Sequence, residues 1–213
     1  MTTPTINHDT DTLVVIDVQN DFCPGGALEV PNGDEVVAPI NGLMERFRHV
    51  LLTQDWHPID HISFASMHEG RNPFEVIQVD YGPQVLWPNH CVQGTSGAEF
   101  HAGLNVDSAE LVIRKGYRQT IDSYSALFEN DRSTSTGLAG YLRDRGFERL
   151  FMAGLATDYC VAYSALDGRR EGFEIIVIDD ACRGIDLEGS VEAAWQQMTD
   201  AGVERIDSRE LAG

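Results

Sequence analysis

Short apolar runs alternate with segments of helical period along most of this 213-residue chain. The apolar runs are nearly continuous and rich in β-branched residues, which is typical of strands buried on both faces of a parallel sheet. The pattern predicts strands at residues 13–18, 50–54, 111–115, 150–155, 174–178 and 202–206. Helices are predicted between these runs, at residues 34–47, 137–146, 157–171 and 188–201.

Such alternation predicts an α/β fold, a three-layer α/β/α sandwich around a six-stranded, mainly parallel sheet. No internal repeat or low-complexity linker interrupts the pattern, so we expect one domain over residues 1–213. Residues 56–109 depart from it, because this stretch is rich in His, Pro, Gly and Asn. Loops of that length inside a compact domain are usually functional, so we expect binding residues there.

Composition narrows the classes of function. A net charge of −19 argues against a nucleic-acid or anionic-membrane partner, since both require a basic surface. No apolar run is long enough to span a bilayer, and the polar first residues show no export signal. The four cysteines lie far apart without paired spacing, so we expect reduced thiols and a cytoplasmic protein.

Reactive side chains fall where the predicted strands end. In open parallel sheets, ligands bind beyond the carboxyl ends of the strands. Asp17 ends the first strand, Asp55 and His57 follow the second, Lys115 ends the third, and Cys160 follows the fourth. We therefore expect a carboxylate, a metal-type cluster, an ammonium and a thiol along one edge of the sheet.

Lys115 is the only lysine, beside fourteen arginines. An ammonium is a compact point charge that fits beside a small nucleophile, whereas a guanidinium is a wide fork. The alternative explanation for this single lysine is compositional drift, in which a lysine-poor composition leaves one lysine at an arbitrary position.

Cys160 lies in the first turn of a predicted helix that Thr157 or Asp158 can cap. A helix N-terminus lowers a thiol's pKa and directs N–H groups outward. The alternative is a buried structural cysteine. Beside these groups, Asp17 could shuttle a proton; otherwise it is a turn carboxylate.

The motifs at residues 17–28, 55–58 and 87–91 closely resemble those of the nicotinamidases, which belong to the isochorismatase-like cysteine hydrolases. Residues 115–116, 122–125, 154–161, 164–167 and 180–183 continue the resemblance in the same order. It covers nearly the whole chain.

The resemblance implies an amidohydrolase that converts nicotinamide to nicotinate and ammonia through a cysteine thioester, in NAD salvage. It implies a catalytic triad of Asp17, Lys115 and Cys160. It also implies an oxyanion site made by the backbone N–H groups of Ala156 and Cys160, after a cis peptide bond between Leu155 and Ala156. Pyrazinamide-like analogues are expected as further substrates.

Asp55, His57 and His90 are ligand types that suit a divalent ion, with His61 as a candidate fourth ligand. Zn²⁺ is the first choice, and Fe²⁺ or Mn²⁺ are alternatives. The resemblance implies that this ion anchors the pyridine nitrogen.

The resemblance also implies an aromatic pocket in which Phe22 and Trp87 sandwich the ring, with Tyr124 and Leu155 lining the wall. Core packing is the alternative explanation for each of these side chains. The sequence leaves open whether the protein forms a homo-oligomer.

Other classes of protein fit less well. The chain has no Gly-x-Gly-x-x-Gly motif after its first strand, which disfavours a dinucleotide-binding dehydrogenase. An iron oxygenase would use two histidines and a carboxylate, but would leave Lys115 and Cys160 idle. A non-catalytic relative is disfavoured because all three triad residues are present. The metal-type cluster favours a nicotinamidase over isochorismatases and carbamoyl-group amidases.

Overall fold

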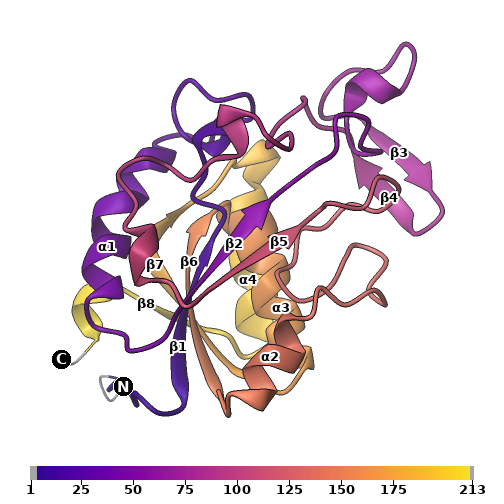
Figure 1. Cartoon of the computed structure of the whole chain (residues 1–213). Helices are drawn as coiled ribbons and strands as arrows, with labels where there is room; N and C mark the ends of the chain where they lie inside the picture. Colours follow the sequence, from indigo (N-terminus) through magenta and orange to yellow (C-terminus); the bar gives the residue numbers. More distant parts are fainter. Residues whose placement is uncertain (1–3, 212–213) are drawn as a thin grey trace.

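The computed structural model describes residues 4–211, and a six-stranded parallel sheet forms its centre (Figure 1). The strand order is β5-β2-β1-β6-β7-β8, and every neighbouring pair is parallel. The strands are β1 (Asp11–Ile16), β2 (Val50–Asp55), β5 (Leu111–Lys115), β6 (Arg149–Leu155), β7 (Glu174–Arg183) and β8 (Glu204–Ile206). The predicted α/β fold and its six strands are confirmed.

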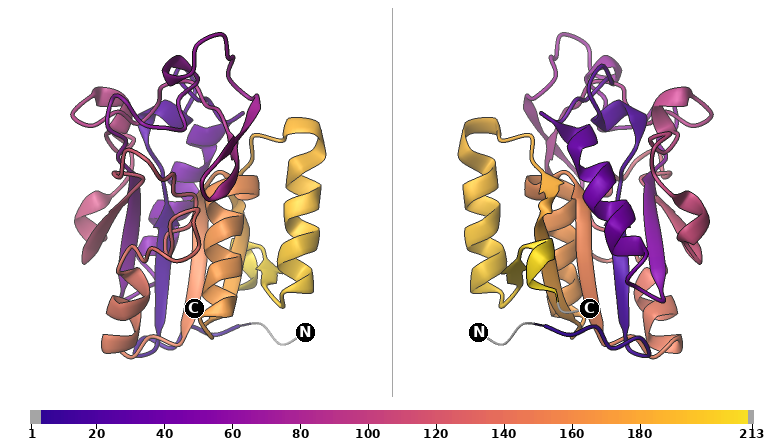
Figure 2. Two further views of the ribbon diagram at one scale, coloured as in Figure 1. Left: turned by 90° about the vertical axis from the view of Figure 1, so that its right-hand side faces the viewer. Right: turned by 90° about the vertical axis from the view of Figure 1, so that its left-hand side faces the viewer.

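Helices cover both faces of the sheet (Figure 2). The helix α1 (Val37–Met44) lies on one face, and three helices lie on the other: α2 (Leu138–Asp144), α3 (Ala162–Arg170) and α4 (Ser190–Asp200). Within residues 4–211, none of the helices is long and apolar enough to cross a membrane.

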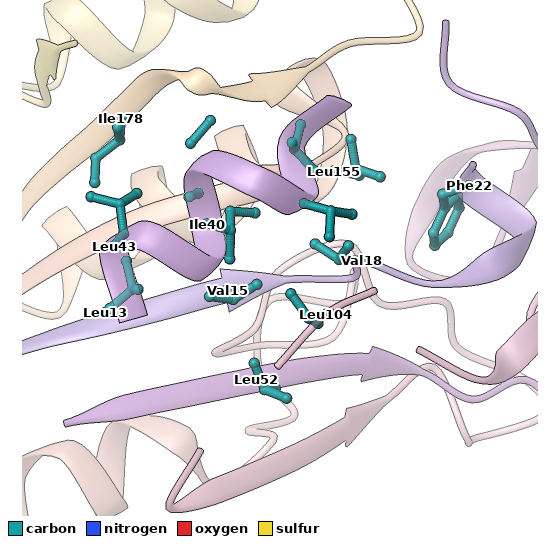
Figure 3. Close-up of a cluster of buried hydrophobic side chains, with 14 of the residues drawn as sticks. Leu13, Val15, Val18, Phe22, Ile40, Leu43, Leu52, Leu104, Leu155 and Ile178 are labelled. Atoms are coloured by element: carbon teal, nitrogen blue, oxygen red, sulfur yellow. The ribbon is translucent and has the colours of Figure 1, made fainter. Parts of the chain in front are cut away.

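The central strand β1 supplies both hydrophobic cores. Because successive side chains point to opposite faces of a sheet, Leu13 and Val15 pack beneath α1, beside Ile40 and Leu43 (Figure 3). Val14 and Ile16 instead enter the core under α2, α3 and α4. The near-continuous apolar pattern of this strand therefore reflects burial on both sides.

Several element ends differ from the prediction. The helix predicted at residues 34–47 begins as a 3₁₀ turn, Gly33–Val36, before α1. The helix predicted at residues 157–171 begins as a π-helical turn, Thr157–Val161, before α3. Strand β7 continues to Arg183, past its predicted end at residue 178, and its pairing with β6 shifts register near Gly154.

The long segment at residues 56–109 contains a hairpin that the sequence pattern did not predict. Strands β3 (Val76–Val79) and β4 (Gly82–Val85) pair antiparallel with each other and project beyond the main sheet, at the upper right of Figure 1. In β3 no side chain is fully buried, and the strand is only four residues long. The rest of the segment consists mostly of turns that carry site residues.

Candidate active site

Asp17, Lys115 and Cys160 meet at the carboxyl edge of the sheet. Asp17 directly follows β1, Lys115 ends β5, and Cys160 lies in the π-helical turn after β6. The Lys115 Nζ atom lies 2.8 Å from Asp17 Oδ2 and 3.4 Å from Cys160 Sγ. All three side chains are buried. The structure thus brings together the three residues that were predicted to form a triad.

Neighbouring groups hold the carboxylate and the ammonium in place. Thr53 donates a hydrogen bond of 2.6 Å from its hydroxyl to Asp17 Oδ1, and accepts one of 3.1 Å from the Asp17 backbone N–H. Lys115 also donates to the Ser123 carbonyl at 2.9 Å and to Asp55 Oδ1 at 2.5 Å. With four partners around it, the Lys115 ammonium has a fixed position.

The thiol of Cys160 carries its proton at rest. Burial raises its pKa well above the ordinary 9.0, and the lowering by Lys115 does not offset this. Burial also raises the pKa of Asp17 above 3.8, again against the influence of Lys115. One ammonium already faces two carboxylates, so a thiolate would add a third negative charge. Burial therefore outweighs the lowering of the thiol pKa that we expected from the helix N-terminus.

The prediction that Thr157 or Asp158 caps the nucleophile helix is wrong. The helical segment follows Ala156, and no side chain makes a capping hydrogen bond there. Asp158 instead turns away and accepts hydrogen bonds from the backbone N–H groups of Ile185 (3.0 Å) and Asp186 (2.9 Å) and from the Ser190 hydroxyl (2.5 Å). It fastens the turn that carries Cys160 to the segment at residues 184–190.

Asp55, His57 and His90 form a second buried cluster, in which one ligand atom from each residue lies within 4.8 Å of the others. His57 Nδ1 donates to the Gly116 carbonyl and His90 Nδ1 to the Pro88 carbonyl, each at 2.8 Å. Their Nε2 atoms face Asp55 Oδ2, at 3.5 Å for His57 and 3.9 Å for His90.

This arrangement fits a divalent cation. Since a carbonyl oxygen only accepts, each Nδ1 carries a hydrogen and each Nε2 offers its lone pair. Burial lowers the pKa of His90 to about 4, which keeps its imidazole neutral. For Asp55, burial raises the pKa, but Lys115 and then His57 outweigh it and hold this carboxyl ionised. Burial lowers the pKa of His57, but Asp55 outweighs this and raises that pKa above 6.5, so a bound cation would displace a proton from His57 Nε2. Two imidazole nitrogens and one anionic oxygen thus converge on one point.

His61 lies beside this cluster with both ring nitrogens engaged. Its ring centroid is 4.3 Å from that of His57. His61 Nε2 faces the Ile121 carbonyl at 3.3 Å, and Nδ1 faces the Ser63 hydroxyl at 2.7 Å. His61 thus packs against one residue of the cluster, and with His57 and Asp122 it forms another group whose ligand atoms lie within 4.8 Å of one another.

Gly116 allows His57 to approach. Its φ is +65°, and a Cβ at this position would lie 2.4 Å from His57 Cε1.

One pocket joins the thiol to the metal-type cluster. Phe22, Trp87 and Tyr124 line it, together with Ala156, Cys160 and the three residues of the metal-type cluster. Trp87 Nε1 donates a hydrogen bond of 3.0 Å to the Tyr124 hydroxyl, which fixes both rings. The aromatic residues predicted from the sequence thus lie where a flat ring could enter.

The Leu155 side chain is not among the pocket-lining residues. It is fully buried in the core beneath α1 (Figure 3). Leu155 can therefore reach a ligand only through its backbone. The cis peptide bond expected between Leu155 and Ala156 is present.

Four further pocket residues were not predicted: Leu28, Asp122, Tyr159 and Ile185. Asp122 accepts hydrogen bonds from Gln84 Nε2 at 2.8 Å and from the Ser123 backbone N–H at 2.9 Å. It lies in the motif at residues 122–125, so its carboxylate was a signal that could have been followed. Ile185 offered no such signal, because the pairing of β7 with β6 up to Arg183 and the Asp158 hydrogen bonds bring its segment here.

Comparison with known proteins agrees, over most of the chain, with the family resemblance of the sequence motifs. The isochorismatase domain family matches residues 11–210. A nicotinamidase of Acinetobacter baylyi is 54% identical over 199 residues, which cover 93% of each chain.

Solved structures are similar in fold as well as in sequence. An Acinetobacter baumanii nicotinamidase/pyrazinamidase superimposes with a TM-score of 0.94 at 55% identity, covering 95% of this chain and 98% of that one. PnC1 from L. infantum, solved with nicotinate, gives 0.86 at 40% identity and covers 98% of both chains. A pyrazinamidase of Pyrococcus horikoshii, solved with zinc, gives 0.74 at 36% identity, covering 92% of this chain and 98% of that one. By the family match, the sequence identity and the shared fold, the chain belongs to the isochorismatase family.

Proposed function

We propose that this chain is a nicotinamidase, which hydrolyses nicotinamide to nicotinate and ammonia and so acts in NAD salvage. One observation carries the proposal: a single pocket is lined by the Cys160 thiol, by the three residues of the metal-type cluster and by the rings of Phe22 and Trp87. Nicotinamide is a flat ring with a nitrogen on one side and a carboxamide on the other, so it matches these three features. The L. infantum relative, solved with nicotinate, supports the same ligand class.

The first half of the reaction forms a thioester. As Cys160 Sγ attacks the carboxamide carbon, its proton passes to Asp17, which is buried within the same group of side chains. Asp17 then donates that proton to the departing nitrogen, the C–N bond breaks, and ammonia leaves. Lys115, held by two carboxylates and the Ser123 carbonyl, keeps Asp17 aligned and offsets negative charge on sulfur.

Backbone N–H groups would stabilise the oxyanion. Ala156 and Cys160 both line the pocket, as this role requires. Losing one such donor typically costs about 10²–10³-fold in rate.

The second half releases nicotinate. Asp17, again a carboxylate, takes a proton from a water molecule that attacks the thioester carbon. The C–S bond breaks and the sulfur takes that proton from Asp17, so the enzyme returns to its resting state.

Asp55, His57 and His90 would hold the divalent ion, which when bound anchors the pyridine nitrogen; we propose Zn²⁺ first, with Fe²⁺ or Mn²⁺ as alternatives. The Pyrococcus horikoshii relative, solved with zinc, supports this order. Because a ring nitrogen and a carboxamide are what the pocket recognises, pyrazinamide-like compounds should also be substrates. We further propose that residues 1–213 form a single domain and that the protein is cytoplasmic.

The decisive experiment measures ammonia release from nicotinamide by the purified protein, with and without a chelator and a thiol-alkylating reagent. Release that is lost on alkylation and reduced by chelation supports both halves of the proposed site. A folded, metal-bound protein that releases no ammonia from nicotinamide would indicate a different amide substrate.

A further inference from the structure

A second cavity, of about 130 Å³, lies behind the active-site pocket and shares one wall with it. That wall is Tyr124, which lines both spaces. The second cavity is formed by the loop after β5, by α3 and by the segment that joins β3 to β4. Four of its lining residues are aromatic: Tyr81, Tyr124, Phe128 and Tyr163.

Glu129 lines this cavity, and one of its carboxylate oxygens is unsatisfied. Its side chain is fully buried, and Oε1 accepts a hydrogen bond of 3.2 Å from Arg118 Nε. The other oxygen, Oε2, is buried and has no hydrogen-bond partner among the described residues. A buried polar atom left unpaired costs about 1–3 kcal/mol, so this oxygen marks a position for a donor.

The charges around the cavity select the kind of donor. Asp167 also lines it, but already pairs with Arg170 at 2.7 Å. Arg132 lies at the exposed rim, whereas the two carboxylates are buried. A carboxylate among aromatic faces is the setting in which cations bind, because the faces of the rings are electronegative.

We propose that this cavity binds a protonated amine, whose ammonium group donates a hydrogen bond to Glu129 Oε2 and whose remaining surface lies against the aromatic rings. Two kinds of ligand carry such a group: ammonium itself, which is the product of the proposed reaction, or a small organic primary amine. The site rests on its own geometry, so its failure would leave the proposed hydrolysis of nicotinamide unaffected.

The size of the cavity allows either source. One water needs about 10–15 Å³ on the same measure, so about 130 Å³ leaves room for an organic group beside the ammonium. Burial raises the pKa of Glu129 to about 7, and a bound cation would favour its ionised form.

Isothermal titration calorimetry of the full-length, metal-loaded protein with benzylammonium chloride tests the proposal. We expect binding that Glu129→Gln weakens by at least about tenfold, as for loss of a charged hydrogen bond. Tetramethylammonium, which cannot donate a hydrogen bond, should bind the wild type more weakly than benzylammonium. Glu110→Gln is the control, because Glu110 is another carboxylate paired with cationic side chains but lies outside the cavity.

Competition with ammonium chloride separates the two sources. Displacement of benzylammonium by ammonium identifies the reaction product as a ligand, and no displacement identifies an organic amine; both results support the site. Undetectable benzylammonium binding overturns the proposal, as does binding that Glu129→Gln leaves unchanged, because such binding would belong to the active-site pocket.

A second variant keeps the test decisive if Glu129→Gln does not fold. Tyr163→Leu removes one ring of the cavity and keeps the carboxylate. Benzylammonium binding should weaken in this variant, and unchanged affinity would refute the assignment.

Discussion

Lys115 and Asp55 form a buried ion pair in which the two oxygens of one carboxylate serve different neighbours. Oδ1 accepts a hydrogen bond from the ammonium, and Oδ2 faces the imidazoles of His57 and His90. The thiol side and the metal side of the pocket therefore share Asp55. A substitution on the thiol side should therefore alter the metal side, and a substitution on the metal side should alter the thiol side, through Asp55.

Lys115→Arg should reduce kcat by at least about 100-fold, because a guanidinium fork cannot occupy the space between Asp17, Asp55 and Cys160. Steady-state kinetics of ammonia release measure this. Arg114→Lys, at the exposed preceding position, is the control and should retain activity. Normal turnover by Lys115→Arg would mean that only the positive charge matters.

Cys160→Ala should lower turnover by about 10⁴-fold or more while the protein stays folded, since it removes the nucleophile. Activity assays and circular dichroism together check this. Cys182→Ala removes another buried thiol, outside the pocket, and should keep its activity. Substantial turnover in Cys160→Ala would rule out the thioester mechanism.

His90→Asn should give a substoichiometric metal content and raise KM by at least about tenfold, because it removes one of three converging ligand atoms. Elemental analysis after dialysis measures the first effect. His61→Asn should retain metal, since both His61 nitrogens already have protein partners. His68→Asn, in the same segment, is the control. Metal loss in His61→Asn would instead make His61 a fourth ligand.

Asp158→Asn should raise KM more than it lowers kcat. The carboxylate accepts bonds from two backbone N–H groups, and an amide nitrogen in that place would repel one of them, which releases Ile185 from the pocket wall. We expect a loss of about 1–3 kcal/mol in the free energy of unfolding. Asp200→Asn, on the exposed side of α4, should change neither quantity. A fall in kcat as large as the rise in KM would mean that Asp158 takes part in the chemical step.

The stability of the wild type should fall as pH rises from about 5 to about 7. Burial raises the pKa of Glu129 from 4.5 to about 7, so the folded state holds a proton that the unfolded state has released. Unfolding midpoints in urea across this range would reveal the slope. Glu129→Gln, which cannot ionise, should show a smaller slope than the wild type. Equal slopes would show that Glu129 is ionised in the folded protein.

The sequence predicted those parts of the site that depend on strand ends. Asp17, Asp55 and Lys115 each lie at or directly after a strand of the parallel sheet, so topology alone brought them to one edge. Cys160 follows the same rule, one turn further along.

Features that depend on distant partners could not be predicted in this way. Asp158 had the residue type of a helix cap, yet its partners lie at residues 185, 186 and 190, which only the folded chain brings near. The β3–β4 hairpin was missed because its strands are only four residues long and, apart from Gln84, none of their side chains is buried. The raised pKa of Cys160 likewise follows from burial, which no local spacing reveals.

Lys115 also gives this protein an internal reporter. It is the only side-chain primary amine in the sequence, and its side chain is fully buried. Amine-reactive reagents should therefore leave it unmodified until the site opens. The rate at which Lys115 becomes labelled, followed by mass spectrometry of the peptide that contains it, would then measure the opening of the catalytic centre directly, without substrate and without an engineered probe.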